Sequence, residues 1–275
     1  MNKIRIGDFL EEYSLKAKKY NREIEGVRLL LLEYLELKEV DFLLNNEIEI
    51  ENKKIDSVIS SLNRYIVDGI PCQYILGYAY FYSRKFIVNS SVLIPRFDTE
   101  VLIEAVLNNT KGNESVVDIG TGSGVIACTL KLERNGYNVD AVDISKEAID
   151  VAKLNACNFK LDINFIENDL LKGLGKYDVI VSNPPYISTN TKVDELVYNN
   201  EPHLALFASD NGLFFYKEIL KEAKNNLNKE GKIFFEIGYD QKDDIMILVK
   251  EIFPEKEVDF IKDYGGNYRV AYIHN

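Results

Sequence analysis

The fold is decided at residues 115–124, which read SVVDIGTGSG. The run of β-branched residues predicts a buried strand, and the glycines predict a tight turn into a helix that begins near Val125. In an open parallel sheet, ligands bind outside the carboxyl ends of the strands, near the point where strand order reverses. Glycines there remove side chains that would block a ligand from the backbone. We therefore expect this loop to hold a nucleotide-sized ligand.

From about residue 93 onward, short apolar strands alternate with helices. This alternation predicts a mostly parallel sheet covered by helices on both faces. We therefore expect residues 93–275 to form one α/β domain. Its expected strands are 115–120, 138–145, 163–169, 177–183, 232–238, 257–263 and 269–274, and its expected helices are 125–136, 146–159, 212–228 and 241–253.

The first part of the chain has a different pattern, in which apolar residues recur at helical spacing. This predicts a helical domain over residues 1–70. The helical pattern stops at residues 69–71, Gly-Ile-Pro. Residues 74–88 are rich in Tyr, Phe and Ile, and they predict a hairpin or an extended connector within the linker 71–92.

The bulk composition excludes several classes of protein. A net charge of −11 argues against a main role in neutralising nucleic-acid phosphates, because that role rests on clustered Lys and Arg. The three cysteines and the isolated His203 and His274 have no metal-site or disulfide spacing. No apolar run approaches the roughly 20 residues that cross a bilayer. We expect a soluble, cytoplasmic monomer with no metal, membrane or nucleic-acid partner.

The glycine spacing limits the ligand of the loop. Gly120, Gly122 and Gly124 are spaced G-x-G-x-G, which lacks the wider gap of the dinucleotide fingerprint. The next strand ends at Asp143, where a carboxylate can accept both hydroxyls of a ribose. Together the loop and the acid predict an adenosine-bearing ligand without phosphates.

The third strand ends in a second acidic position. Asp169 and Leu170 follow it, and a carboxylate and an apolar side chain at this place can flank an adenine. A helix cap is an equally good interpretation of Asp169.

The strongest local signal is the tetrad Asn183-Pro184-Pro185-Tyr186, which closes the fourth strand. Residues before proline avoid the helical region and proline has no N–H, so the segment is extended, rigid and rich in free carbonyls. If the Asn183 side-chain oxygen and the Pro184 carbonyl each accept one N–H of a planar NH2 group, its nitrogen is turned toward a methyl donor. Both acceptors then oppose positive charge that develops in the transition state. Tyr186 can stack on the planar group.

These motifs resemble the HemK/PrmC family of protein-glutamine methyltransferases, which modify peptide-chain release factors. The resemblance covers nearly all of the second domain and its linker. It runs through residues 71–77 (PCQYILG), 92–100 (VLIPRFDTE), 116–124 (VVDIGTGSG), 142–145 (VDIS), 181–188 (VSNPPYIS), 201–219 (EPHLALFASDNGLFFYKEI), 235–241 (FEIGYDQ) and 263–270 (DYGGNYRV).

The resemblance implies a class I methyltransferase fold, S-adenosylmethionine as methyl donor and a glutamine in a Gly-Gly-Gln motif of a release factor as substrate. It assigns the glutamine amide to Asn183–Tyr186, and substrate recognition to the helical domain. The chain departs from the family at Leu170, where an aromatic residue is usual. The residues that the resemblance places on the cofactor are Gly120, Thr121, Gly122, Ser123, Gly124, Asp143, Leu170 and Asn183.

Arg96, Thr99 and Glu100 are candidates for the methionine end of the cofactor. An alternative is that Arg96 and Glu100 form an i,i+4 pair on a helix.

Three other functions compete with glutamine methylation. A nucleic-acid amino methyltransferase uses the same tetrad, but it must extrude a base and grip phosphates, and the chain shows no basic cluster for this. A nucleotide-binding regulator without catalysis is opposed by the intact tetrad. A nicotinamide dehydrogenase is opposed by the glycine spacing.

Overall fold

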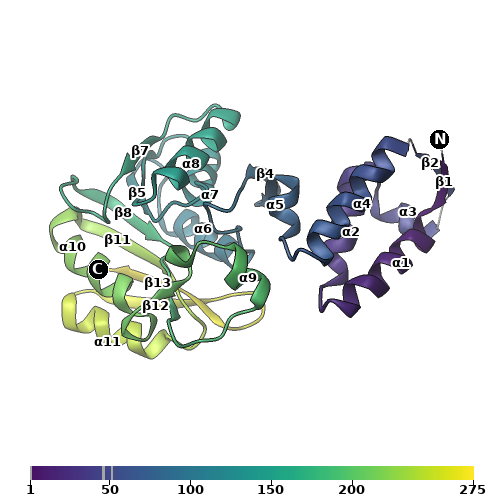
Figure 1. The fold of residues 1–275 in the computed structure, drawn as a ribbon. Helices are drawn as coiled ribbons and strands as arrows, with labels where there is room; N and C mark the ends of the chain where they lie inside the picture. Colours follow the sequence, from purple (N-terminus) through teal and green to yellow (C-terminus); the bar gives the residue numbers. More distant parts are fainter. Residues whose placement is uncertain (1, 45–46, 51) are drawn as a thin grey trace. The chain divides into compact units, whose positions relative to one another are not determined.

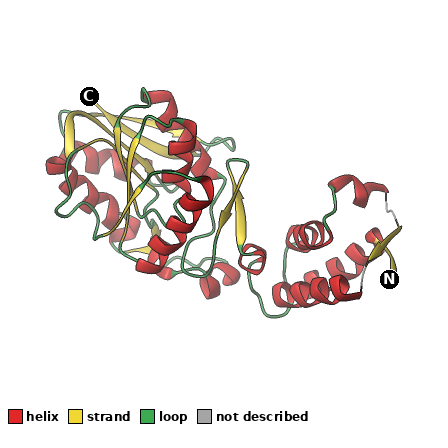
Figure 2. Cartoon of the chain, turned by 90° about the horizontal axis from the view of Figure 1, so that it is seen from above, coloured by secondary structure: helices red, strands yellow, loops and turns green. Residues whose placement is uncertain are grey.

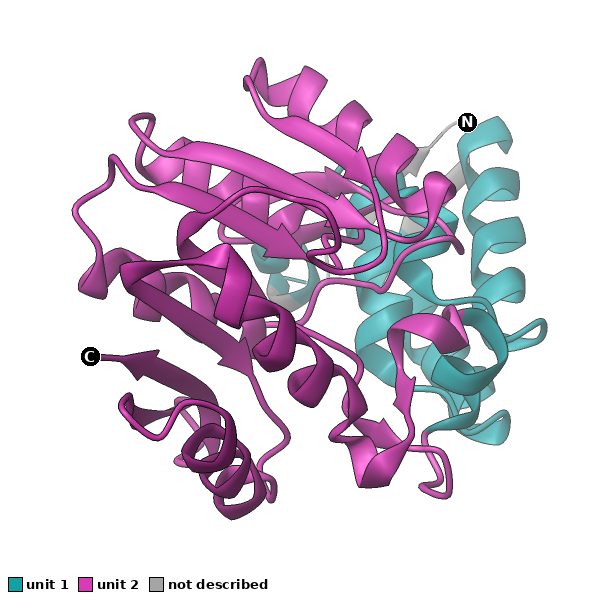
Figure 3. Cartoon of the chain, turned by 90° about the vertical axis from the view of Figure 1, so that its left-hand side faces the viewer, with its two compact units in different colours: residues 1–77, 194–200 teal, residues 78–193, 201–275 magenta. Residues whose placement is uncertain are grey.

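The computed structural model describes residues 2–44, 47–50 and 52–275. The chain divides into two units, which have different colours in Figure 3. The helical unit consists of residues 1–77 and 194–200, and the sheet unit consists of residues 78–193 and 201–275. The sequence predicts a first boundary after residue 70, and it does not predict that residues 194–200 join the first unit.

The sheet unit is built on a seven-stranded sheet with the order β12-β13-β11-β8-β5-β6-β7. Strand β13 is antiparallel to both neighbours, and the other neighbouring pairs are parallel. The predicted α/β class is therefore confirmed. The strands are β5 (Ser115–Ile119), β6 (Asn138–Asp143), β7 (Asn164–Glu167), β8 (Tyr177–Ser182), β11 (Leu227–Glu236), β12 (Glu257–Lys262) and β13 (Tyr268–His274).

Helices cover both faces of this sheet (Figures 1 and 2). One face packs against α6 (Asp98–Asn109), α7 (Val125–Glu133) and α8 (Lys146–Phe159). The other packs against α10 (Phe214–Asn226) and α11 (Lys242–Ile252). Each face therefore has its own apolar core.

The central strands are buried on both sides, which explains their nearly continuous apolar sequences. Successive side chains of a strand point to opposite faces. In β5, Val116 belongs to the core under α6 and α7, whereas Val117 belongs to the core under α10 and α11. Both are fully buried.

The strand order reverses between β5 and β8, which are neighbours at the middle of the sheet. From β5 the chain adds β6 and β7 on one side, and from β8 it continues to β11 on the other. In parallel sheets this reversal leaves a crevice at the carboxyl ends of the strands. The glycine loop follows β5 and the Asn-Pro-Pro-Tyr tetrad follows β8, so both open onto this crevice.

The linker contains a short helix that the sequence does not predict. α5 (Cys72–Leu76) ends at Gly77, which has a φ of 78° and closes the helix as a left-handed cap. The predicted hairpin begins only after it, as β3 (Tyr78–Phe81) and β4 (Arg84–Ile87).

The helical unit holds a small core of its own. Gly26 on α2 lies against Tyr65 on α4, and a Cβ at Gly26 would come within 2.3 Å of the tyrosine ring. The Tyr65 hydroxyl donates to the Glu23 carbonyl at 2.9 Å and ties the two helices together. The helices are α1 (Ile6–Lys19), α2 (Ile24–Leu35), α3 (Glu39–Leu44), α4 (Asn52–Ile66), α5 and α9 (Glu195–Asn200).

Short elements complete the chain. Strands β1 (Asn2–Arg5) and β2 (Glu47–Ile50) form an antiparallel pair within the region that the sequence predicts to be helical. In the sheet unit, β9 (Ile187–Ser188) pairs with β10 (Phe207–Ala208). The 3₁₀ helices are η1 (His203–Ala205) and η2 (Asp210–Gly212). Among the described residues, no helix is both long and apolar enough to span a bilayer.

Candidate active site

A cavity lies at the carboxyl ends of β5, β6 and β8, where the strand order reverses. Both predicted motifs reach it: Gly120 and Gly122 come from the loop after β5, and Asn183 comes from the tetrad after β8. The cavity also has apolar walls. These are formed by Ile144, Ala148, Leu170, Leu204, Phe215 and Ile219.

The glycine loop turns sharply because its three glycines all have positive φ, at 70°, 55° and 79° for Gly120, Gly122 and Gly124. A Cβ at Gly120 would have no atom within 4 Å, so the loop leaves its backbone open to a ligand. Gly124 has a packing role instead, since a Cβ there would lie 3.0 Å from the Cβ of Ala152 on α8.

Thr121, Ser123 and Gly124 do not line the cavity, although the sequence predicts that the whole loop contacts the cofactor. Thr121 and Ser123 are buried, at 3% and 2% exposure. The Thr121 hydroxyl donates to Asp118 at 2.6 Å, and the Ser123 carbonyl accepts from Asn155 on α8 at 2.8 Å. These residues shape the turn, and Gly120 and Gly122, which line the cavity, form its ligand-facing edge.

Asp118, which the sequence analysis leaves without a role, is fully buried beneath the loop. Its Oδ2 accepts from the Thr121 hydroxyl and from Ala127 N at 3.1 Å, whereas its buried Oδ1 has no partner among the described residues. Burial raises the pKa of Asp118 to about 7, against the lowering effect of these two hydrogen bonds. Asp118 stands two residues before Gly120, and a carboxylate at this place before a glycine loop is the sequence signal that could have identified Asp118.

Asp143 lies at the end of β6 and faces the cavity. Its Oδ2 accepts from Gly122 N and its Oδ1 from Ser145 N, both at 2.9 Å. Burial raises its pKa, and the hydrogen bonds from Ser145 and Gly122 oppose the rise. Each carboxylate oxygen keeps a second lone pair, so the group can still accept two hydroxyls.

Asp169 and Leu170 also line the cavity, next to Asn168. Leu170 has a φ of 51°, a left-handed conformation that is unfavourable for a residue with a Cβ. Asp169 pairs with Lys172, and it does not begin a helix in the structure. The helix-cap interpretation of Asp169 is therefore wrong.

The tetrad forms the opposite wall of the cavity. Asn183, Pro184 and Pro185 line it, whereas Tyr186 packs against the core beside α10. Within the described part of the chain, no group donates a hydrogen bond to the Asn183 side-chain oxygen or to the Pro184 carbonyl. Asn183 Oδ1 and Pro184 O are thus two acceptors at the edge of the cavity that can receive N–H groups of a ligand.

Tyr186 is held from behind. Its carbonyl accepts from the Gln241 side chain at 3.2 Å. Gly212 passes so close that a Cβ there would lie 2.1 Å from the same carbonyl. Burial raises the pKa of Tyr186 to about 12, so its hydroxyl stays protonated. The sequence assigns no role to Gln241 or Gly212, although both lie in stretches that resemble the family.

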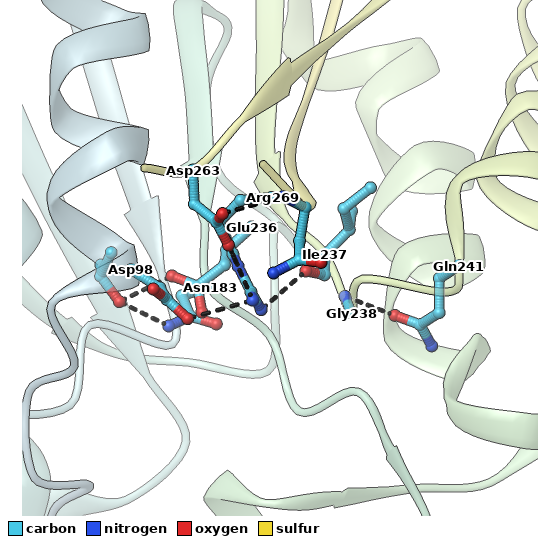
Figure 4. A network of polar contacts seen from close by, with 10 residues as sticks. Asp98, Asn183, Glu236, Ile237, Gly238, Gln241, Asp263 and Arg269 are labelled. Atoms are coloured by element: carbon cyan, nitrogen blue, oxygen red, sulfur yellow. Dashed lines mark hydrogen bonds and ion pairs between the residues drawn. The ribbon is translucent and has the colours of Figure 1, made fainter. Parts of the chain in front are cut away.

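Asn183 belongs to a network of polar contacts that includes Asp98, Glu236 and Arg269 (Figure 4). The Asn183 Nδ2 donates to Thr99 Oγ1 at 3.1 Å, and that hydroxyl donates to Glu236 Oε2 at 2.6 Å. Arg269 pairs with Asp98 at 3.1 Å and with Asp263 at 3.2 Å. The sequence analysis leaves Glu236 and Arg269 without a role.

Arg96, Thr99 and Glu100 do not line the cavity, so the structure gives no support to their predicted contact with the cofactor. The alternative i,i+4 pair is also wrong, because α6 begins only at Asp98. Arg96 instead pairs with the buried Glu201 at 2.6 Å, and Glu100 accepts from Tyr82 N at 2.7 Å.

Neither histidine belongs to the cavity. His203 lies edge-on to Phe207, and His274 contacts Asp259 at 3.0 Å. Across residues 2–44, 47–50 and 52–275, no three His, Cys, Asp or Glu side chains gather as metal ligands.

Comparison with known sequences places the chain among methyltransferases. A family model described as the methyltransferase small domain matches residues 96–206. A release factor glutamine methyltransferase from Streptococcus pneumoniae (strain ATCC BAA-255 / R6) is 36% identical over 98% of this chain and 98% of its own. The enzyme of that name from Bacillus subtilis (strain 168) is 42% identical over 75% of this chain and 77% of its own.

Comparison with solved structures identifies the fold. A methyltransferase from Pyrococcus furiosus matches with a TM-score of 0.54 at 20% identity, over 82% of this chain and 98% of its own. A ribosomal protein L11 methylase from Lactobacillus delbrueckii subsp. bulgaricus matches with a TM-score of 0.50 at 22% identity, over 72% and 90%. The predicted class I methyltransferase fold is confirmed.

Proposed function

We propose that this chain, which belongs to the release factor glutamine methyltransferase family, transfers a methyl group from S-adenosylmethionine to the side-chain amide nitrogen of a release factor glutamine. The observation that carries the proposal is the pair of free acceptors, Asn183 Oδ1 and Pro184 O, at the wall of the cavity. The glutamine is the one in the Gly-Gly-Gln motif that the family resemblance implies.

The cavity fits the chemistry of S-adenosylmethionine. Asp143 can accept both ribose hydroxyls, because each of its oxygens has a lone pair to spare. Two apolar side chains of the cavity wall, Ile144 next to Asp143 and Leu170 after β7, flank the adenine. Gly120 and Gly122 present bare backbone to the rest of the cofactor, which carries no phosphate. When bound, the cofactor supplies an electrophilic methyl group on a sulfonium.

The tetrad supplies the other half of the reaction. An amide nitrogen is a poor nucleophile because its lone pair is delocalised into the carbonyl. Asn183 Oδ1 and Pro184 O each accept one N–H, orient the nitrogen and stabilise the positive charge that it gains during transfer. The two prolines hold the Pro184 carbonyl and the backbone of Asn183 rigidly, which limits reorganisation as the reaction proceeds. Catalysis is therefore mainly positioning and electrostatic stabilisation.

The proposal includes a partner, a compartment and a role for each unit. The release factor is the protein substrate, and we place the reaction in the cytoplasm, where such factors act. The helical unit recognises the body of the factor, while the sheet unit holds the cofactor and the glutamine. The enzyme acts as a monomer and binds no nucleic acid, in keeping with its net charge of −11.

The alternative is methylation of an adenine or guanine amino group, which also needs two acceptors beside the methyl. The comparisons do not favour it, because the relatives at 36% and 42% identity carry the release factor name.

A direct test incubates the purified protein with labelled S-adenosylmethionine and either a Gly-Gly-Gln release factor or bulk DNA and RNA. We expect label in the factor alone. The N183A variant should keep most of its cofactor affinity and lose most of its turnover, because the missing acceptor acts in the transition state. Label that enters nucleic acid but not the factor would refute the proposal.

A further inference from the structure

We propose that Thr99 and Glu236 are positioning residues, which form a one-way hydrogen-bond chain that holds the Asn183 amide with its oxygen toward the substrate. The inference rests on the proposed function, since it concerns the acceptor that receives the glutamine N–H. Neither residue lines the cavity, so each acts through Asn183.

The direction of this hydrogen-bond chain follows from which of its three side chains can donate a hydrogen and which can only accept one. An ionised carboxylate only accepts, so Glu236 Oε2 must receive the hydrogen of the Thr99 hydroxyl, 2.6 Å away. With its single hydrogen committed, Thr99 Oγ1 can only accept from Asn183 at 3.1 Å. The group that faces Thr99 is therefore the NH2 of Asn183. Its oxygen, at the other end of the planar amide, must therefore point away from Thr99.

This orientation matters because the two ends of an amide have nearly the same shape. A flipped Asn183 would fill the same space and present N–H groups to the glutamine NH2, which is itself a donor. That arrangement removes an acceptor and places two donors against each other. The extended tetrad fixes the backbone of Asn183 but not the rotation of its amide. The hydrogen-bond chain from Glu236 through Thr99 fixes the rotation of the Asn183 amide.

Glu236 stands at the end of β11 in a fully enclosed place, with 1% of its surface exposed. Arg269 on β13 is the cation that faces it, and Asp98 on α6 is the nearby anion. Tyr186 and Tyr216 also approach it, and the Tyr216 hydroxyl donates to the Glu236 backbone carbonyl at 2.8 Å. A buried carboxylate is costly. Glu236 contacts the Asn183 side chain both directly and through Thr99, and because a carboxylate only accepts, both contacts favour the Asn183 NH2 on this side.

Protonation of Glu236 would allow the hydrogen bonds between Glu236, Thr99 and Asn183 to reverse direction. A protonated carboxyl can donate to Thr99 Oγ1, which frees the Thr99 hydrogen to bond the Asn183 oxygen instead. Burial raises the pKa of Glu236 to about 7, against the lowering effects of the Thr99 hydrogen bond, of Arg269 and of a hydrogen bond from Asn183. Turnover should therefore fall as the pH decreases through about 7.

The first test compares T99V with T99S on the full-length protein, using labelled S-adenosylmethionine and a Gly-Gly-Gln release factor. T99V keeps the side-chain shape and lacks the hydroxyl, so we expect kcat to fall by about tenfold or more, with the KM and Kd for S-adenosylmethionine changed by less than about twofold. T99S restores the hydroxyl and should recover most of the loss.

Thr129→Val is the matched control. Thr129 is fully buried in α7 and its Oγ1 has no partner among the described residues, so the same chemical change there should leave kcat as it is. Wild-type kcat in T99V overturns the inference, and so does a T99S variant as slow as T99V. A wild-type protein that does not label the factor contradicts the proposed function itself.

The second test is the pH profile of kcat between pH 6 and pH 8 for the wild type and E236Q. The amide introduced by E236Q cannot ionise and can present either of its ends to Thr99. We expect kcat of the wild type to fall as the pH decreases through about 7. E236Q should have a lower kcat that does not show this fall. Asp118 has a pKa raised to about the same value, so it is the rival source of such a fall. A fall that stays unchanged in E236Q would assign it to another group and overturn the role of Glu236.

Discussion

At the scale of single residues, we propose that binding of the cofactor depends most on one carboxylate, that of Asp143. Asp143 lies at the end of β6, where it braces Gly122 and Ser145 and faces the cavity. A group that accepts two ribose hydroxyls contributes mainly to the affinity for the cofactor, because the ribose does not change during methyl transfer.

We therefore expect D143A to raise the Kd for S-adenosylmethionine by about 100-fold, through the loss of two charge-assisted hydrogen bonds. Isothermal titration calorimetry measures this directly. D140A is the matched control, since Asp140 lies on the same strand, bonds the Tyr177 hydroxyl at 2.6 Å and does not line the cavity. Equal affinities for D143A and D140A would show that Asp143 does not hold the ribose.

The buried Asp118 predicts a dependence of stability on pH. Its pKa is raised to about 7 in the folded protein, so the native state holds this proton more tightly than the unfolded chain does. Stability from this group is present at low pH and is lost as the pH rises through about 7. The amide introduced by D118N cannot ionise, so the melting temperature of D118N relative to wild type should increase between pH 5 and pH 8. A difference that is constant with pH would contradict the raised pKa.

The residues that could be identified from the sequence are those that belong to short motifs of neighbouring residues. Asn183 and Gly120 stand in short motifs next to predicted strands, and both line the cavity. Glu236 could not be found this way, because it meets Thr99 across 137 positions of the chain. The same holds for Arg269, whose partner Asp98 lies on a different element.

At the scale of elements, the tetrad keeps its shape because other segments press on it from behind. Gln241 bonds the Tyr186 carbonyl, and Gly212 lies against the same atom with a φ of 88°. Position 212 thus requires glycine for two reasons: its backbone is left-handed, and there is no room for a Cβ.

G212A should therefore disturb both stability and catalysis. We expect a loss of more than about 2 kcal/mol in the free energy of unfolding, because the cost of the clash adds to that of the left-handed conformation. G173A separates the two costs, since Gly173 has a φ of 73° but open space around its Cβ position. Denaturant titrations and kcat measurements of both variants make the comparison. A G212A variant no worse than G173A would mean that the contact with Tyr186 does not shape the site.

The sequence predicts the sheet and its helices well because the central strands are buried on both faces and the helices have one apolar side. It misses α6, which covers one face of the sheet, and α5, a five-residue helix too short to show periodicity. It also misses the pairing of β1 with β2, because partners of a four-residue strand cannot be read from its own sequence.

At the scale of the whole molecule, the chain divides into two units, and we propose that they have different tasks. The sequence does not predict that residues 194–200 belong to the helical unit. The segment joins it through Leu196, which packs on its core, and through Asn200, whose side chain donates to the Gly69 carbonyl at 2.8 Å. Contacts of this kind, between segments far apart in sequence, leave no local pattern.

If the helical unit recognises the body of the release factor, a short Gly-Gly-Gln peptide should be a poor substrate. We expect kcat/KM for the peptide to be about 100-fold lower than for the factor, chiefly through a higher KM, because the lost contacts are the same in the ground and transition states. Steady-state kinetics with both substrates measure this. A peptide that matches the intact factor would place all recognition at the glutamine site.

The central claim is that Asn183 and Pro184 present two acceptors to a glutamine amide beside the methyl donor. A crystal structure with S-adenosylhomocysteine and a Gly-Gly-Gln peptide tests it most directly. We predict the glutamine nitrogen within about 3 Å of both Asn183 Oδ1 and Pro184 O, on the side that faces the cofactor sulfur. An Asn183 oxygen that faces away from the sulfur, with no space for a side-chain amide between them, would contradict the account.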